Sequence, residues 1–145
     1  MESERFAGAR YCEEVSQENI ELVRSVYESL NHGDWDAAFA HADPDFEVTF
    51  QRGPNAGTHR GRDSIRAIIE DQREAFEVWI IEVEQVFDSG DQVVALIKSR
   101  LRPRGTDAEF EIRNGHIWTI RDGLGVSLRG FPNPEEALKA AGLRE

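Results

Sequence analysis

Cysteine is almost absent from this chain, since Cys12 is the only one among its 145 residues. A single cysteine excludes an internal disulfide and any metal site built from several cysteines. No apolar run approaches the roughly 20 residues that a membrane-spanning helix needs, and residues 1–14 lack the apolar segment of a secretory signal. We therefore expect a cytoplasmic protein with no membrane partner. We also expect residues 1–14 to form a disordered leader, in which Cys12 lacks the fixed partners of a nucleophile.

Positive charge is scarce as well. The chain has 17 Lys and Arg against 28 Asp and Glu, which gives a formal net charge of -11. Nucleic acids and anionic membrane surfaces are bound by clustered Lys and Arg, so neither is expected as a partner. A chain of this length has enough residues for one domain with a substantial core, and we expect a single domain over residues 15–145.

Metal-ligating patterns are also missing. The four histidines do not have the spacing of a metal site: they are His32, His41, His59 and His116. The glycines between residues 53 and 61 do not match a phosphate-binding loop. We expect neither a metal nor a cofactor.

Apolar residues at helical spacing predict four helices. Ile20, Val23, Tyr27 and Leu30 form one stripe after a suitable N-cap at Ser16, and Gly33 ends that helix. A short second helix is expected to begin after Asp34 as N-cap and to carry Trp35, Ala38 and Phe39. A third is expected over about residues 62–76, and a terminal helix from Pro134 until Gly142 stops it. The last of them has Asn133 as N-cap and a capping box.

Alternation with a period of two predicts strands that follow the third helix. They are expected near residues 78–88, 92–102, 109–121 and 126–128, with an earlier strand at 46–50 and a loop over 52–61. Consecutive antiparallel strands with helices on one face make an α+β fold. A curved antiparallel sheet wrapped around the helices leaves a cone-shaped interior, which is where a small ligand is usually bound.

The strand at residues 109–121 is the most informative segment. Its buried face is expected to carry two apolar residues at each end and two polar residues, Asn114 and His116, between them. A polar group removed from water without a partner costs roughly 1–3 kcal/mol. Either both side chains are satisfied by internal hydrogen bonds, or this face lines a cavity in which His116 is the main polar group.

His116 is the candidate catalytic residue. A histidine with a pKa near its usual value of about 6.5 exchanges a proton at neutral pH, and burial favours the neutral form. Such a side chain suits general acid–base work or a hydrogen bond to a ligand carbonyl. Asn114 is the candidate that orients His116 or binds the ligand, because the two lie roughly 6.5–7 Å apart along the strand.

The chain resembles a SnoaL-like member of the nuclear-transport-factor-2-like (NTF2-like) superfamily. The segments that carry the resemblance are Tyr27–Asp34, Ala42–Val48, His59–Gly61, Gly90–Val94, His116–Gly123 and Glu135–Leu138. This fold hosts isomerases, cyclases, dehydratases, epoxide hydrolases and binding modules, so the resemblance implies the fold more than an activity. It also implies a homodimer formed through the outer sheet face, where Ile80, Val86 and Ile117 would form the patch.

Ketosteroid isomerase is the best-understood relative of this kind, and its catalytic groups are missing here. Its helix tyrosine corresponds to Val26, its aspartate base to Phe50, and its second acid to the neighbourhood of His116. Tyr27 is one residue from the tyrosine position, which is about 100° around the helix, so we expect it to point elsewhere. Steroid isomerisation is therefore disfavoured.

Four further residues are candidates for ligand binding. Tyr27 would bring its hydroxyl to the rim of the cavity, Trp118 and Phe50 would form its wall, and His59 would lie at its mouth.

Three readings of the function stay open. The first is a cofactor-independent lyase, isomerase or cyclase that acts on a hydrophobic oxygenated substrate. The second is a carrier of a small apolar ligand, and the third is a structural homodimer with a filled cavity. A buried carboxylate beside His116 would favour the enzyme, although Glu47, Glu82, Glu84 and Glu111 are all expected to face outward unless the register is off by one residue.

Overall fold

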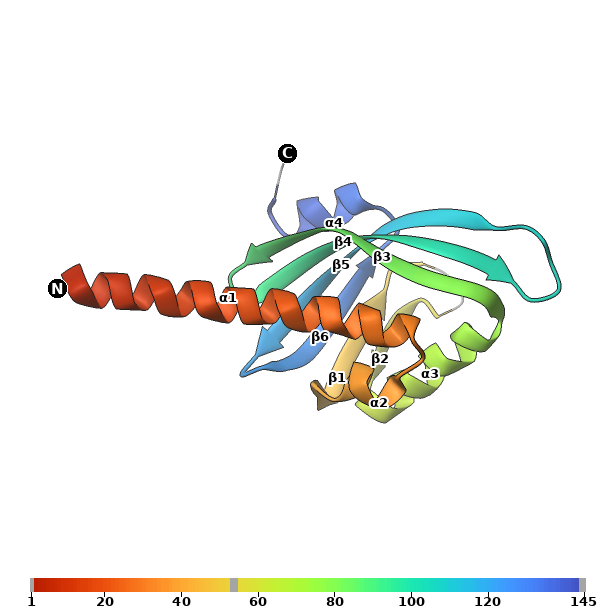
Figure 1. The fold of residues 1–145 in the computed structure, drawn as a ribbon, viewed down its shortest axis with the longest axis horizontal. Coiled ribbons are helices and arrows are strands. Elements are labelled where there is room, and N and C mark those ends of the chain that lie inside the picture. The colour runs from red at the N-terminus through yellow and green to blue at the C-terminus, as the bar shows by residue number, and fades with distance from the viewer. Residues whose placement is uncertain (1, 53–54, 144–145) are drawn as a thin grey trace.

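The computed structural model describes residues 2–52 and 55–143, with side chains described from residue 17 onward. Four helices and six strands make up this part of the chain, in the order α1-α2-β1-β2-α3-β3-β4-β5-β6-α4 (Figure 1). The helices are α1 (Glu2–Asn31), α2 (Trp35–Phe39), α3 (Arg62–Glu74) and α4 (Pro134–Ala140). The strands are β1 (Ala42–Phe50), β2 (Gly57–Arg60), β3 (Phe76–Ser89), β4 (Gln92–Pro103), β5 (Phe110–Arg121) and β6 (Leu124–Phe131).

The six strands form one curved sheet in the order β2-β1-β6-β5-β4-β3. Neighbouring strands are antiparallel except β1 and β6, which are parallel, so the sheet is mixed and not purely antiparallel as predicted. The chain connects β1 to β6 through β2, α3 and strands β3 to β5. The two strands therefore do not form a hairpin, which would make them antiparallel. Figure 1 shows α1 crossing the concave face, α2 and α3 closing it below, and α4 on the opposite side of the sheet. The predicted α+β, NTF2-like architecture is confirmed.

Two predicted caps are present in the structure. The Asp34 side chain accepts a hydrogen bond from the backbone N–H of Ala37 and begins α2. Asn133 accepts from the backbone N–H of Glu136 at 2.9 Å and donates to its carboxylate at 3.2 Å, which is the predicted capping box of α4.

The start of α1 differs from the prediction. The helix begins at Glu2 and not after Ser16, so residues 2–14 are helical where a disordered leader was predicted. The physical reason lies in composition, because this segment is rich in Glu, Ala and Arg and has no proline to stop a helix. The N-cap at Ser16 falls on a side chain outside the described ones, and the domain boundary at residue 15 stays a prediction.

The predicted loop over residues 52–61 contains a short strand. β2 pairs antiparallel with β1, with Val48 opposite His59 and Phe50 opposite Gly57. Gly57, one of the glycines that indicated a loop, is the first residue of β2. Gly57 has a φ of 109°, which a residue with a side chain rarely adopts.

A β-bulge in β3 reverses the predicted faces of its last residues. Val83 pairs with Ile97 and Val86 pairs with Ala95, so β3 has one residue more than β4 between these pairs. Val86 consequently packs against the inner core, and Phe87 packs against the cluster under α4. The sequence predicted the outer face for Val86, because strict alternation cannot reveal an inserted residue.

The outer face of the sheet is partly covered by α4. Ile117, predicted to lie in an exposed dimer patch, is fully buried with Val94, Leu96, Ala137 and Leu138. Helix and sheet come so close that a Cβ at Gly115 would clash with the Cβ of Ala137. The predicted patch of Ile80, Val86 and Ile117 is therefore wrong, since α4 covers one member and the bulge turns another inward.

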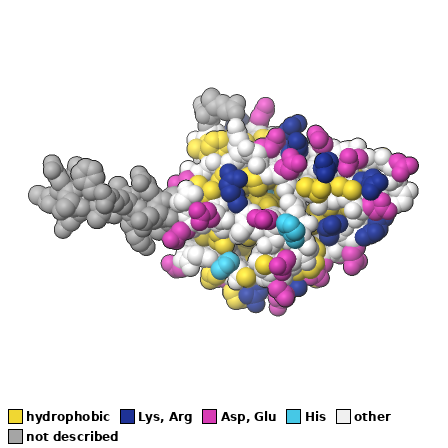
Figure 2. Space-filling model, in the orientation of Figure 1, with side chains coloured by type: hydrophobic (Ala, Val, Ile, Leu, Met, Phe, Trp, Pro, Cys, Tyr) yellow, Lys and Arg dark blue, Asp and Glu magenta, His cyan; other side chains and the backbone are white. Residues whose placement is uncertain are grey.

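Beyond α4, the outer face carries ion pairs between side chains of β3, β4 and β5. They join Lys98 to Glu82, Arg113 to Glu84 and Arg102 to Glu77. Glu82 and Glu84 thus face outward as predicted. Figure 2 shows basic side chains distributed singly among acidic ones on the visible face. None of the helices in the described part of the chain is long and apolar enough to cross a membrane.

Candidate functional site

A cavity of about 250 Å³ lies between the concave face of the sheet and helices α1, α2 and α3. Its wall is mostly apolar and includes Phe39, Phe46, Ile69, Trp79 and Leu128. An apolar cavity of about 150 Å³ is known to bind benzene, so this one has room for one to two rings. The cavity agrees with the predicted cone-shaped interior and defines the candidate binding site.

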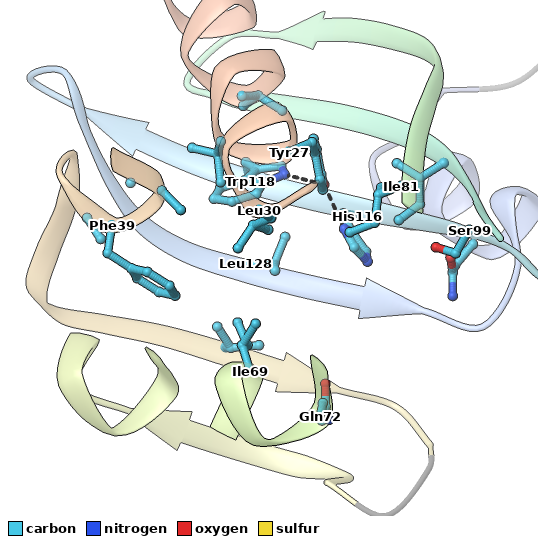
Figure 3. A pocket seen from close by; sticks show the side chains of 18 of the residues that line it. Tyr27, Leu30, Phe39, Ile69, Gln72, Ile81, Ser99, His116, Trp118 and Leu128 are labelled. Carbon is cyan, nitrogen blue, oxygen red and sulfur yellow. Dashed lines mark hydrogen bonds between the residues drawn. The ribbon is translucent and has the colours of Figure 1, made fainter. Parts of the chain in front are cut away.

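His116, Tyr27 and Trp118 form a hydrogen-bonded chain along the cavity wall (Figure 3). The Tyr27 hydroxyl lies 2.6 Å from Nδ1 of His116, and Nε1 of Trp118 donates to the same hydroxyl at 2.9 Å. The ring centroids of Tyr27 and His116 are 5.8 Å apart, and Trp118 meets Tyr27 edge-on. Two residues on β5 are thus tied to one residue on α1.

The donors and acceptors in this chain set the tautomer of His116. The indole N–H of Trp118 can only donate, so the Tyr27 oxygen accepts from it. The remaining O–H of Tyr27 has His116 Nδ1 as its acceptor, and no other acceptor in the described residues is within reach. From this network we infer that Tyr27 donates to Nδ1 and that the neutral ring carries its hydrogen on Nε2. Nε2 has no hydrogen-bond partner in the described part of the chain.

Burial keeps both ionisable groups of the chain neutral. Desolvation lowers the pKa of His116 from 6.5 to about 4. Desolvation also raises the pKa of the Tyr27 hydroxyl, and its hydrogen bond from Trp118 offsets only part of this rise. At neutral pH His116 is consequently an uncharged ring that presents an N–H to the cavity.

The position of Tyr27 corrects one prediction. The offset of about 100° from the isomerase position was expected to turn Tyr27 elsewhere, yet Val26 and Tyr27 both line the cavity. The sheet curves around α1, so the cavity contacts more of the helix surface than a flat sheet would. Tyr27 is 2% exposed and its hydroxyl is engaged inside the wall, so it does not lie at the rim.

Asn114 lines the cavity, as predicted, but does not contact His116. Its Oδ1 atom is buried and has no hydrogen-bond partner among the described residues. Tyr27 is the residue that holds the His116 ring. Of the two roles predicted for Asn114, orienting His116 is therefore excluded by the geometry, and ligand binding stays open.

The remaining predicted residues divide into two groups. Phe50 and Trp118 line the cavity, in agreement with their predicted places in its wall. His59 is not among the lining residues, because Nε2 of its ring bonds to the carbonyl of Asn55 at 2.8 Å. It lies on the edge strand β2, with its ring beside Phe50, and so contacts the wall from outside.

Three polar residues of the cavity lining were missed in the sequence: the exposed His41 before β1, Ser99 and Gln72. The last two carry a signal in the sequence. Ser99 follows Ala95 and Ile97 on the inner face of β4, and Gln72 continues the helical stripe of Ile65 and Ile69 on α3. Both are polar residues at apolar positions of a periodic pattern. That signal identified Asn114 and His116 and would have identified these two as well.

The lining contains no carboxylate among the residues described here. Glu47 forms an ion pair with Arg60, while Glu82 and Glu84 pair with cations on the outer face. His116 therefore has no acidic partner in the described structure. Within residues 2–52 and 55–143, no cluster of three His, Cys, Asp or Glu side chains could hold a metal ion.

The curved sheet, the helices on its concave face and the cavity between them define an NTF2-like protein. Within this class, the chain belongs to the SnoaL-like domain family, which matches residues 23–128. The family resemblance in the sequence is thus confirmed. No curated protein sequence matches this chain significantly.

Several solved structures share the fold. An NTF2-like protein from Burkholderia thailandensis is 26% identical, with a TM-score of 0.69 over 86% of this chain and 96% of that one. TerC, which was co-crystallized with polyporic acid, is 20% identical, with a TM-score of 0.71 over 86% and 98%. A candidate polyketide cyclase from Xanthomonas campestris pathovar campestris is 21% identical, with a TM-score of 0.67 over 87% and 98%. These likenesses concern the fold.

Proposed function

We propose that this protein binds a small, uncharged, largely apolar molecule in the cavity, and that His116 donates a hydrogen bond from Nε2 to an oxygen of that molecule. The observation that carries the proposal is the bond between Tyr27 and Nδ1, because it leaves the N–H of the ring at Nε2. The mostly apolar wall supports an apolar ligand body. The co-crystallization of TerC, a protein of the same fold, with polyporic acid supports a small-molecule ligand.

If the protein turns its ligand over, the reaction is a cofactor-independent isomerisation, elimination or cyclisation at a carbonyl. A neutral imidazole that donates an N–H to a carbonyl oxygen stabilises negative charge that develops on it. His116 is then the catalytic residue, as the sequence predicted. Its role is to polarise the carbonyl and not to accept a proton at Nε2, since that nitrogen already carries one.

A binding module without turnover is the second candidate. The observation that favours it is the lack of a carboxylate in the described cavity lining, because proton transfer from carbon usually employs a positioned base. A purely structural role would require a filled cavity, and the volume of about 250 Å³ argues against it. The homodimer and the cytoplasmic location stay predictions. Because α4 covers part of the outer sheet face, a dimer through this face would use the row of ion pairs beside α4.

A thermal-shift screen tests the binding proposal. Wild type, His116→Phe and His32→Phe are melted with aryl ketones, enones and phenols; His32 is the control because it lies at the end of α1, outside the cavity lining. A ligand at 100 times its dissociation constant stabilises the native state by about 2.7 kcal/mol, or roughly 5–10 °C at this size. We expect a carbonyl ligand to stabilise wild type and His32→Phe but to stabilise His116→Phe much less. Equal shifts in all three proteins would exclude His116 as the contact.

A further inference from the structure

One side of the cavity has three polar side chains without a hydrogen-bond partner among the described residues. They come from three elements: Asn114 from β5, Ser99 from β4 and Gln72 from α3. Figure 3 shows Ser99 and Gln72 on the same side of the cavity as His116 and away from Phe39. Asn114 is opposite Ile97 in the sheet, so Ser99 is its diagonal neighbour on the same face, roughly 7–8 Å away.

The unpartnered oxygen of Asn114 is the informative feature. Its Oδ1 atom is buried, and no donor in the described residues reaches it. An apolar side chain at this position would avoid the loss of stability that an unsatisfied buried acceptor causes. Ser99 is 8% exposed, and its hydroxyl also has no partner in the described structure. Polar groups kept in this state are suited to a ligand that supplies the missing donor.

Asn114 and His116 offer complementary hydrogen-bonding groups to a ligand. Nε2 of His116 presents a donor, and Oδ1 of Asn114 presents an acceptor. The Cα atoms of the two residues lie roughly 6.5–7 Å apart, because they are two residues apart along β5. No Lys, Arg, Asp or Glu belongs to the described lining, and its second histidine, His41, is exposed to solvent. The described lining therefore offers no permanent opposite charge to an anion or a cation. The cavity therefore selects an uncharged molecule with an acceptor and a donor separated by about one ring.

We propose that Asn114 and Ser99 form a second polar subsite, which binds a hydroxyl group of a ligand whose carbonyl oxygen accepts from His116. The ligand class is an uncharged aromatic hydroxy-ketone. The Asn114 oxygen accepts the hydroxyl hydrogen, and the Ser99 hydroxyl can donate to the same oxygen. This inference rests on the proposed function, since it takes the His116 contact and the cavity as given.

Calorimetric titration with three ketones tests the subsite. The probes are acetophenone, para-hydroxyacetophenone and para-methoxyacetophenone, because the methoxy group keeps the shape but cannot donate. We expect wild type to bind the hydroxy ketone about tenfold more tightly than the methoxy ketone. In Asn114→Leu this preference should fall to about one, while acetophenone still binds within about threefold of wild type. Ser99→Ala should reduce the preference in part.

The outcomes separate this inference from the proposed function. A hydroxyl preference that persists in Asn114→Leu and Ser99→Ala would overturn the subsite. Equal affinity of wild type for the three ketones would overturn it as well, and this comparison needs no variant to fold. In that case binding of acetophenone that weakens in His116→Phe would leave the proposed function standing. If wild type bound neither the ketones nor naphthalene, both proposals would fail.

Discussion

Between pH 6.5 and pH 4, His116 should cost the wild-type protein about 3 kcal/mol of unfolding free energy, and His116→Phe should not show this loss. Burial lowers the pKa of His116 in the folded protein to about 4, whereas the unfolded chain protonates it near 6.5. As the pH falls through this window, only the unfolded state gains a proton, so wild type loses stability. The full contribution is present above pH 6.5 and is lost as the pH approaches 4. Urea unfolding of wild type and variant at several pH values measures the difference.

A second variant separates titration from packing in this experiment. His116→Gln keeps a polar side chain at the position but has no titratable ring. Its stability relative to wild type should change with pH in the same way as that of His116→Phe, even if the two variants differ in absolute stability. Parallel stability curves for wild type and both variants would show that His116 does not have a lowered pKa in the native state.

Removing the Tyr27 hydroxyl should destabilise the protein by about 2–4 kcal/mol, because two buried groups lose their partner at once. In Tyr27→Phe the indole N–H of Trp118 loses its acceptor and Nδ1 of His116 loses its donor. The aromatic ring and its core contacts are retained, so the loss reports on the hydrogen bonds. Denaturant unfolding at pH 7 measures the change in free energy.

Two further variants separate the contributions of the two Tyr27 hydrogen bonds to this loss of stability. Trp118→Phe removes the indole N–H and keeps Tyr27 bound to His116, so it tests one of the two bonds. The double variant Tyr27→Phe with Trp118→Phe should lose less than the sum of the single losses, since the two residues share one hydrogen bond. A loss below about 0.5 kcal/mol in Tyr27→Phe would contradict the hydrogen-bonded chain.

Local sequence signals predicted most of the fold. The caps at Asp34 and Asn133 and the period-two strands each depend on residues close together in the chain, and the structure contains them. Two errors arose where pairing between strands, and not local sequence, decides the structure. The strand β2 lies in a segment rich in glycine, and the extra residue of β3 near Glu84 leaves no mark in the alternation. The long α1 depends on helix propensity over residues 2–14, where the mixture of charged and small residues indicated disorder instead.

The candidate site was predicted in its position but not in its connections. The polar pair in an apolar row is enough to place Asn114 and His116 on the cavity face. The partner of His116 could not be found in this way, because Tyr27 lies 89 residues earlier in the chain and belongs to an ordinary helical stripe. Only the packing of α1 across the sheet brings its hydroxyl to the ring. The same packing is the basis on which we infer the tautomer of His116, and its catalytic role stays a prediction.

Nitrogen-15 NMR of the histidine-labelled protein tests the central claim most directly, because it reads the protonation of each ring nitrogen. The His116 signals are assigned by their loss in His116→Gln. At pH 7 we predict a neutral ring with hydrogen on Nε2 and a bare Nδ1, and saturation with acetophenone should shift the Nε2 resonance. A ring protonated on Nδ1, or an Nε2 resonance unchanged at saturation, would contradict the account.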